Sequence, residues 1–351
     1  MMLSAGNGFI MQSEKYSRDN AGQSLKKYIL LKKGELAYNH GASKAKQYGC
    51  CYELTEKEAR IPYVYHCFKI CETEYTPYIA IALNNSKMDR QLKRLVSSSV
   101  RMDGLLNISF EDYMSITVSL PSSEEQKHIA DFLNKLDERI KAQERLVSSL
   151  KKYKRGLLTY AFEEITLSDD ADSTTYLFSE IAQRRKEKYN PDCNVEYPCI
   201  ELEHIEQGTG RLLGSVSSKT QSSIKTVAKS GDILFGKLRP YLRKFAFAEQ
   251  DMVCSSEIWA FVPSKYVIPK YLYYLVQTEH FLRVANISSG TKMPRAEWAN
   301  IEKEPFDIPY IPIQEKVVSI LEAVDKKISV SGDSLRMLLN FRDGLLQQLF
   351  I

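Results

Sequence analysis

Two stretches of the chain carry apolar residues at alternating steps of four and three, which is the spacing of the contact seam in a coiled coil. The first stretch runs from Ser123 to Ala161, and the second follows the same steps near the C-terminus. The second pattern is the first displaced by one constant, 188 positions (314 minus 126), and the polar interruptions Gln143 and Lys154 recur as Ser331 and Arg342. The predicted helix-pair seam consists of Ile129, Leu133, Leu136, Ile140, Val147, Leu150, Leu157, Val317, Leu321, Val324, Ile328, Leu335, Leu338 and Leu345.

The same displacement relates residues outside the seam, which indicates an internal duplication. The matched pairs include Pro121 and Pro309, Gln126 and Gln314, Asp137 and Asp325, and Gly156 and Gly344. The alternative is two unrelated surface helices whose stripes face separate cores. In addition, Ser123 is followed three residues later by Gln126, and this capping-box pattern predicts the start of the first helix.

Length and composition set broad limits on the class of protein. A chain of 351 residues favours two domains, and a net charge of +4 is only mildly basic, so an argument for nucleic-acid binding must rest on where charges cluster. The seven cysteines form an odd set without a secretory segment, and no apolar run approaches the ~18 residues of a membrane span. We therefore expect a cytoplasmic, reduced protein with no membrane partner. We also expect no metal site, because Cys67 and Cys71 have no second pair at ligand spacing.

The linker between the two halves constrains the predicted architecture. A helix of about 39 residues is ~58 Å long, whereas the acidic stretch from Glu163 to Thr175, about 13 residues, reaches at most ~45 Å. The second domain must therefore lie near the far end of the first helix, and the second helix can pair with the first only by running back along it. The predicted fold is α+β, with two domains of mixed sheet and helices separated by two long antiparallel coiled-coil helices in a pseudo-two-fold dumbbell. Lys154 and Arg342 are expected to snorkel outward from the seam. The expected boundaries are residues 1–121, 122–162, 163–311 and 312–351.

Local patterns predict related strands in the two halves. A turn glycine and an acidic residue precede a short apolar strand that ends near Tyr38 in the first half and near Phe235 in the second. In the first half we expect a loop over residues 38–52, a strand over 63–70 and one helix over 75–95. The first half is short, because it has no counterpart of the segment over residues 176–182.

No catalytic motif is found in the sequence. The stretch from Gly231 to Lys237 has the spacing of a phosphate-binding loop, but Leu238 follows where serine or threonine would hold magnesium, and the interior reads as a strand. Neither a dinucleotide-binding glycine pattern nor a nucleophile elbow is present. The paired carboxylates at 163–164 and 169–170 lie in solvated polar segments, where a charged surface is the ordinary interpretation.

A basic loop in the second half is the strongest candidate for a binding site. In this loop cations alternate with Tyr241, a pattern that is typical of contacts to a phosphate backbone. Nearby segments add short hydrogen-bond donors, a carboxylate and a guanidinium, which are the groups that read base edges. By itself such a charge run is more often a solvated surface, but the first half carries basic and small polar residues at corresponding points. The predicted DNA contacts are Lys237, Arg239, Tyr241, Arg243, Lys244, Ser255, Ser256, Glu257, Thr291, Lys292 and Arg295, with Lys44, Lys93, Arg94 and Arg101 in the first half.

From about Gly8 onward the sequence resembles the DNA-specificity subunit of type I restriction and modification systems. The stretches that carry the resemblance are Ile200-Glu-Leu-Glu-His-Ile205, Gly208-Thr-Gly210, Gly231-Asp-Ile-Leu-Phe-Gly-Lys-Leu-Arg-Pro-Tyr-Leu242, Cys254-Ser-Ser-Glu257, Gly290-Thr-Lys-Met-Pro-Arg295 and Leu120-Pro-Ser-Ser-Glu-Glu-Gln126. The architecture of that family, two target-recognition domains held apart by two antiparallel helices, agrees with the dumbbell expected from linker length. The short first domain departs from the family pattern.

The resemblance implies a non-catalytic reader of a bipartite double-stranded DNA target. Its helices would act as a ruler and as docking surfaces for two methyltransferase subunits, and restriction subunits would complete the complex. This chain would hold no cofactor, because S-adenosylmethionine, ATP and magnesium would be bound by the partner subunits. The alternatives are a coiled-coil scaffold that binds proteins without DNA, and a fused nuclease or methylase.

Overall fold

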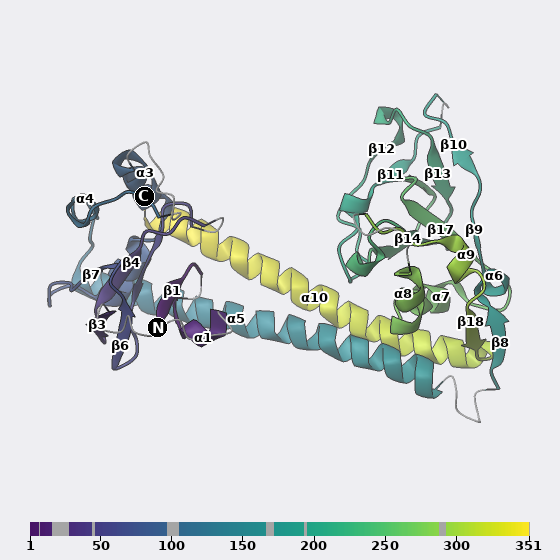
Figure 1. Ribbon diagram of the computed structural model, residues 1–351, viewed down its shortest axis with the longest axis horizontal. Helices are drawn as coiled ribbons and strands as arrows, with labels where there is room; N and C mark the ends of the chain where they lie inside the picture. The colour runs from purple at the N-terminus through teal and green to yellow at the C-terminus, as the bar shows by residue number, and fades with distance from the viewer. Residues whose placement is uncertain are drawn as a thin grey trace. The chain divides into compact units, whose positions relative to one another are not determined.

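The computed structural model describes residues 1–6, 8–15, 28–43, 46–96, 105–165, 172–192, 195–287 and 293–350. The chain is α+β and divides into two compact units (Figure 1). Unit 1 comprises Met1–Glu144 with Asp333–Ile351, and unit 2 comprises Arg145–Gly332. Two long helices, α5 (Ser123–Thr159) and α10 (Ile311–Leu349), each contribute one part to either unit. A π-helical turn over Tyr160–Ile165 follows α5.

The two long helices are antiparallel within each unit. In unit 1, Asp137 of α5 pairs with Arg342 of α10, while Ala130, further back along α5, shares a core with Phe350, further forward along α10. In unit 2, Lys154 pairs with Asp325, and the later part of α5 packs into one core with the earlier part of α10. The α5 segment in that core contains Leu157, Leu158 and Ala161, and the α10 segment contains Val317, Val318 and Leu321. The prediction of an α+β chain with two long antiparallel helices is therefore confirmed.

The two ion pairs between the helices are related by the internal duplication. The displacement of 188 positions carries Asp137 onto Asp325 and Lys154 onto Arg342, so each pair is the counterpart of the other. The expectation that Lys154 snorkels outward is wrong. Its side chain is buried, with Nζ 2.7 Å from a carboxylate oxygen of Asp325 and 2.9 Å from Oε1 of Gln277, because these partners satisfy the charge inside the unit.

Both helices begin in the same way. Gln126 and Gln314 are fully buried, and their Nε2 groups donate to the carbonyl oxygens of Pro121 and Pro309 at 3.0 and 2.8 Å. The expectation of a capping box from Ser123 to Gln126 is wrong. Ser122 is the capping residue, because its Oγ accepts from the Glu125 N–H, while Gln126 turns its side chain inward.

The described part of unit 2 contains three sheets and short helices that pack on them. A five-stranded sheet has the order β10-β13-β16-β11-β12, a four-stranded sheet has the order β15-β14-β17-β9, and β8 pairs with β18. The elements are β8 (Thr174–Leu177), α6 (Phe178–Ile181), β9 (Ala182–Arg184), β10 (Lys188–Tyr189), β11 (Pro198–Ile200), β12 (Val216–Ser217), β13 (Lys225–Ala228), β14 (Ile233–Gly236), β15 (Phe245–Phe247), β16 (Met252–Cys254), β17 (Ile258–Pro263), α7 (Pro269–Leu275), α8 (Glu279–Ala285), α9 (Trp298–Ile301) and β18 (Pro305–Ile308).

Unit 1 repeats the central part of this arrangement with fewer strands. Its β4 lies between β5 and β7, as β14 lies between β15 and β17, which agrees with the related strands expected from the two turn glycines. The elements are β1 (Met2–Ser4), β2 (Gly8–Ile10), α1 (Gln12–Lys15), β3 (Tyr28–Lys32), β4 (Leu36–Asn39), β5 (Cys50–Glu53), β6 (Glu58–Pro62), β7 (His66–Phe68), α2 (Thr76–Ala82), α3 (Ser86–Leu95) and α4 (Phe110–Met114).

Three local expectations for unit 1 need correction. The helix predicted over 75–95 is two helices, because Asn85 caps a new start at α3 by accepting hydrogen bonds from the N–H groups of Lys87 and Met88. The strand predicted over 63–70 is confined to β7, and a turn occupies its first part. The loop predicted over 38–52 is shorter at both ends, because β4 continues to Asn39 and β5 begins at Cys50.

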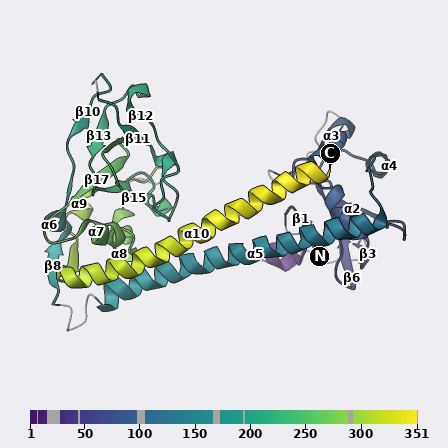
Figure 2. The same cartoon turned by 180° about the vertical axis from the view of Figure 1, so that it is seen from behind.

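The residues of the predicted seam are buried or half-buried along both helices. Beyond them, Leu349 at the end of α10 is exposed. Figure 2 shows the pair from the opposite side. None of the helices in the described part of the chain combines the length and apolarity that crossing a membrane requires.

The two related ion pairs should differ in their effect on stability. Lys154→Ala removes the cation paired with Asp325 and the donor to Oε1 of Gln277 inside the unit, and we expect it to lower the free energy of unfolding by about 3 kcal/mol. Arg342→Ala, in a pair that is about one third exposed, should cost about 1 kcal/mol. Urea unfolding of the full chain measures both, with the exposed Lys152→Ala as control. A loss for Arg342→Ala as large as that for Lys154→Ala would contradict this ranking.

Candidate nucleic-acid interface

The basic loop of unit 2 joins β14 to β15 and is held in an unusual backbone conformation. A 3-10 turn over Pro240–Leu242 lies between Arg239 and Arg243, which have φ values of 52° and 50°. Left-handed conformations cost an L-residue roughly 1–2 kcal/mol each, and among the described non-glycine residues only Asp172 shares this sign of φ. Such strain persists where surrounding structure imposes it, and it concentrates at functional sites.

Main-chain hydrogen bonds impose this conformation. The Arg239 N–H donates to the Pro294 carbonyl at 2.8 Å, and the Ala296 N–H donates to the Lys237 carbonyl at 2.8 Å. At the other end of the loop, the Gly236 N–H donates to the Lys244 carbonyl at 2.8 Å. The basic loop is therefore joined to the segment over 294–296, which comes almost sixty residues later in the chain.

The side chains of the basic loop serve different purposes. Arg239 and Tyr241 are exposed, and within the described parts of the chain neither Arg239 nor the half-buried Lys237 has a side-chain partner. Arg243 forms an ion pair with Glu279 at 2.7 Å, and Lys244 donates to the Leu202 carbonyl at 2.6 Å. Two of the predicted cations are thus available to a ligand, and two support the fold.

A second guanidinium is held beside the loop by a carboxylate. Arg295 donates from Nε and Nη2 to the two carboxylate oxygens of Glu257, at 3.1 and 3.2 Å. This fork raises the pKa of Arg295, because the hydrogen bonds and the negative charge favour its charged form. The main chain of Arg295 also pairs with that of Leu238 in an isolated antiparallel β-bridge, so the fork lies directly against the basic loop.

The turn between β16 and β17 brings the third predicted segment to the same place. The Ser255 N–H donates to the Ile200 carbonyl, and the Lys237 N–H donates to the Glu257 carbonyl, both at 2.9 Å. Ser256 is exposed on this turn. Segments 237–239, 255–257 and 294–296 therefore converge. Thr291 and Lys292 lie outside the described residues.

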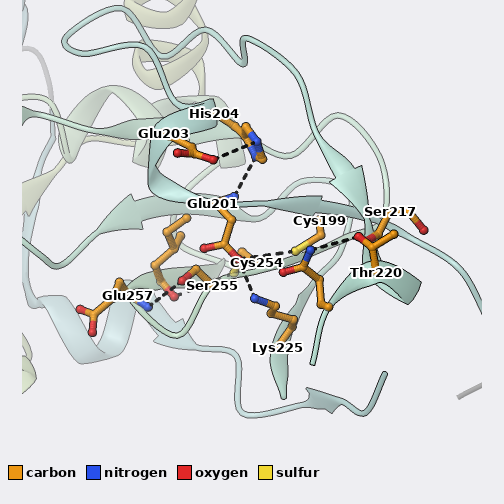
Figure 3. A network of polar contacts seen from close by, with 12 residues as sticks. Cys199, Glu201, Glu203, His204, Ser217, Thr220, Lys225, Cys254, Ser255 and Glu257 are labelled. Atoms are coloured by element: carbon orange, nitrogen blue, oxygen red, sulfur yellow. Dashed lines mark hydrogen bonds and ion pairs between the residues drawn. The ribbon is translucent and has the colours of Figure 1, made fainter. Parts of the chain in front are cut away.

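Sequence reasoning missed a buried ion pair beneath this turn. Lys225 of β13 points at Glu201, with Nζ 2.6 Å from Oε1, and its residue is only 5% exposed (Figure 3). The Glu201 N–H donates to Nδ1 of His204, which places the proton of the neutral ring on Nε2. The charged stretch after Ile200, which contains Glu201, was the signal in the sequence that could have pointed to this pair. The partner of Glu201, Lys225, lies on another strand and could not be found from it. The pair joins β11 to β13.

Two thiols lie in the same network, and they are inert at neutral pH. Burial raises the pKa of Cys199 to about 11 and that of Cys254 to about 12. The thiolate is the nucleophile and the metal ligand, so neither group is suited to either task. Across the described residues, no group of three or more histidine, cysteine or acidic side chains is arranged to hold a metal ion.

Unit 1 uses the same main-chain frame with different side chains. Gly41 bridges Leu105, as Leu238 bridges Arg295, and the Leu106 N–H donates to the His40 carbonyl at 2.9 Å, as Ala296 does to Lys237. His40 therefore stands at the position of Lys237, but it is buried. The predicted contacts Lys93 and Arg94 are exposed in the last turn of α3. Lys44 and Arg101 lie outside the described residues.

The fold and the site define a protein with two related α+β units, each carrying the same bridged loop. The chain matches the family model described as "Type I restriction modification DNA specificity domain" over residues 23–152 and 177–336, more than half of its length. It therefore belongs to that family.

Individual relatives agree with this assignment. The chain is 25% identical over 250 residues to the type I restriction enzyme EcoDI specificity subunit of Escherichia coli, covering 60% of this chain and 55% of the relative. It is 21% identical over 266 residues to the MjaVIII specificity subunit of Methanocaldococcus jannaschii, covering 67% and 61%. The chain thus spans a little over half the length of these two relatives.

Solved structures share the fold. The type I restriction-modification system S subunit from M. genitalium is 16% identical, with a TM-score of 0.55 over 93% of this chain and 85% of that chain. A structure described as showing complex assembly and conformational transition of the type I R-M system is 14% identical, with a TM-score of 0.54 over 92% and 82%.

Two glycines beside the basic loop allow a matched test of its support. Gly208 donates its N–H to the Arg243 carbonyl, and a Cβ there would meet nothing within 4 Å, whereas a Cβ at Gly210 would lie 1.9 Å from the hydroxyl oxygen of Tyr273. Both have positive φ, so Gly208→Ala should cost roughly 1–2 kcal/mol from backbone strain alone. Gly210→Ala should cost about 1–3 kcal/mol more from overpacking. Thermal unfolding of both variants checks this, and equal losses would contradict it.

Proposed function

We propose that this chain is the non-catalytic, sequence-reading subunit of a type I restriction-modification complex. The observation that carries the proposal is the convergence of three separate segments of unit 2. Together they present Lys237 and Arg239, whose side chains have no partner among the described residues, beside the Arg295–Glu257 fork. Arginine reads guanine by a bidentate contact to its major-groove edge, and serine and carboxylate groups serve adjacent contacts. The strained, hydrogen-bonded loop would place these groups before DNA arrives.

The two units would read the two parts of a bipartite double-stranded DNA target. Support comes from the repeated bridge at Leu238 and Gly41, which gives each unit an equivalent loop with different side chains. Lys93 and Arg94 are the exposed cations that we assign to the reading surface of unit 1. Because the loops differ, the two half-sites would differ in sequence.

We further propose that two methyltransferase subunits dock on the long helices and that restriction subunits join them, in the cytoplasm where the target DNA lies. S-adenosylmethionine, ATP and magnesium would belong to those partners. Support comes from exposed apolar side chains that recur under the displacement of 188 positions. Phe132 and Ile320 are one such pair, 49% and 38% exposed, and Tyr153 and Phe341 are the other, 60% and 52% exposed. Each of these residues immediately precedes a position of the seam pattern. Unit 1 carries Phe132 and Phe341, and unit 2 carries Tyr153 and Ile320, so each unit has an equivalent docking flank, formed by two exposed apolar side chains beside the seam, for one copy of the same partner.

Arg239→Ala tests the reading loop. In the complex assembled with the partner subunits, we expect it to weaken binding to the target duplex by about 1–3 kcal/mol if Arg239 makes a bidentate base contact, with a similar loss for Arg295→Ala. Mobility-shift titration measures the affinity. Methylome sequencing of a host that carries the complex should give a two-part motif for the wild type, and the variants should change one part only.

Lys303→Ala is the charge-matched control, because this exposed residue lies outside the converging segments. Equal losses of affinity for Lys303→Ala and Arg239→Ala would mean that Arg239 contributes only its positive charge and makes no specific base contact. An assembled wild-type complex with no affinity for any duplex would favour a protein-binding scaffold instead.

The docking flanks predict a stepwise change in stoichiometry. We expect the wild type to bind two methyltransferase subunits, Tyr153→Asp and Phe341→Asp to bind one each, and the double variant to bind none, because a buried carboxylate without a partner is costly. Native mass spectrometry of the mixed subunits counts the copies. Ser148→Asp introduces the same charge at an exposed position on another face of α5, turned by about 140° from Tyr153, and should leave two copies bound. Two copies on the double variant would refute these flanks.

A further inference from the structure

One sheet of unit 2 has no counterpart among the described residues of unit 1. In unit 2, β8 pairs antiparallel with β18 in the register Leu177 to Pro305 through Thr174 to Ile308. Both views show this ribbon beside the start of α10 (Figures 1 and 2). The helix that follows β8 begins with Phe178, which is fully buried against Trp298 and Phe306, at ring-centroid distances of 6.0 and 5.8 Å. Strand β8 and helix α6 thus close this edge of the unit.

The receiving half of this arrangement is present in unit 1. The displacement of 188 positions carries Thr117–Leu120 onto β18, Phe110 onto Trp298 and the start of α5 onto the start of α10. The buried amides of Gln126 and Gln314 show that the two helix starts adopt equivalent geometry. The residues over 117–120 therefore stand where a strand edge stands in unit 2.

Among the described residues of unit 1, none forms a strand along this edge. Leu120 is 44% exposed, whereas its counterpart Ile308 is 3% exposed, and Phe110 is 41% exposed. The amide of Gln91 bonds the N–H and carbonyl of Thr117, at 3.0 and 2.8 Å. The main chain of Val118–Leu120 makes no hydrogen bond with another described residue. Apolar side chains and free backbone groups together form an open site for strand addition.

We propose that the surface formed by Phe110 and residues 117–120 is a docking site for a strand–helix segment of a separate polypeptide. The occupant is an extended stretch of about four residues that pairs antiparallel with 117–120, followed by a helical turn whose first residue is aromatic. This chemistry is specified by β8 and α6, which occupy the equivalent surface of unit 2. The aromatic residue packs between Phe110 and Val118, the counterparts of Trp298 and Phe306.

The test uses the full chain and a labelled peptide with the sequence of residues 173–183, which contains β8 and α6. We expect saturable binding by fluorescence anisotropy, and hydrogen exchange at the amides of 118–120 slowed at least tenfold at saturation. The same peptide carrying Phe178→Asp is the control ligand and should bind at least tenfold more weakly. The amides of Phe306–Ile308, already paired in unit 2, should exchange slowly throughout and serve as an internal reference.

Variants of the chain locate the site. Successive N–H groups of an extended strand point to opposite sides, so one of Val118→Pro and Ser119→Pro removes a donor that faces the peptide. At least one should weaken binding tenfold, while Ser119→Ala should not. Leu120→Asp, at an exposed side chain, gives a second route if a proline variant fails to fold.

Three results would overturn the proposal. The first is slow exchange at 118–120 in the chain alone, which would mean that the chain itself fills the site. The second is no saturable binding of the peptide up to about 1 mM. The third is undiminished affinity in both proline variants and in Leu120→Asp.

Discussion

Two buried glutamine side chains fix how the chain enters its long helices. Gln126 and Gln314 are completely inaccessible to solvent, and each accepts a hydrogen bond through Oε1 from the start of a preceding short helix, from the Tyr75 N–H at 3.0 Å and the Ile268 N–H at 2.9 Å. Their Nε2 groups bond the proline carbonyl just before each long helix. An unmet buried amide costs about 1–3 kcal/mol, so other angles of entry are disfavoured. Each glutamine thereby ties the start of a short helix, α2 or α7, to the start of a long helix.

On this shared frame the two units differ in what they expose. The bridge after β14 presents Lys237 and Arg239, whereas the corresponding bridge after β4 presents His40, whose ring lies 5.0 Å from that of His66 and is shielded from solvent. The main-chain bridge and the bond to the carbonyl of His40 or Lys237 recur in both, so this part of the frame tolerates replacement of the reading side chains. A scaffold of this kind can change its specificity by substitutions in the loop without new folding problems.

The sequence could predict features that depend on periodicity and on the internal offset. These include both long helices, their direction, and strands β4 and β14. It could not predict the strained Arg239, because a left-handed arginine is imposed by the distant Pro294 carbonyl and not by local propensity. The convergence of the predicted contact segments depends on the same long-range bridges. That the predicted residues meet in space is therefore new information, whereas their role in binding DNA stays a prediction.

Two errors came from signals that the sequence did contain. Lys154 was expected to point outward because a lysine interrupts an apolar seam, but the antiparallel register implied by the duplication places Asp325 opposite it, as Asp137 lies opposite Arg342. The break between α2 and α3 is marked by Asn85, a strong capping residue that an uninterrupted helical pattern over 75–95 concealed. In both cases the apolar pattern was given more weight than a specific polar partner.

Most of the cations around the candidate interface are committed to the fold. Arg185 forks onto Asp232 at 2.6 and 2.8 Å, and the residues that follow Asp232 form strand β14 and not a phosphate-binding loop. Lys225 and Arg243 are likewise paired, with Glu201 and Glu279. A surface with few free cations releases few counterions from DNA, so its non-specific affinity is low. Under the proposed function, the partner subunits would therefore supply most of the attraction to the phosphate backbone. This chain would contribute the discrimination between bases, which depends on rigidly placed side chains more than on net charge.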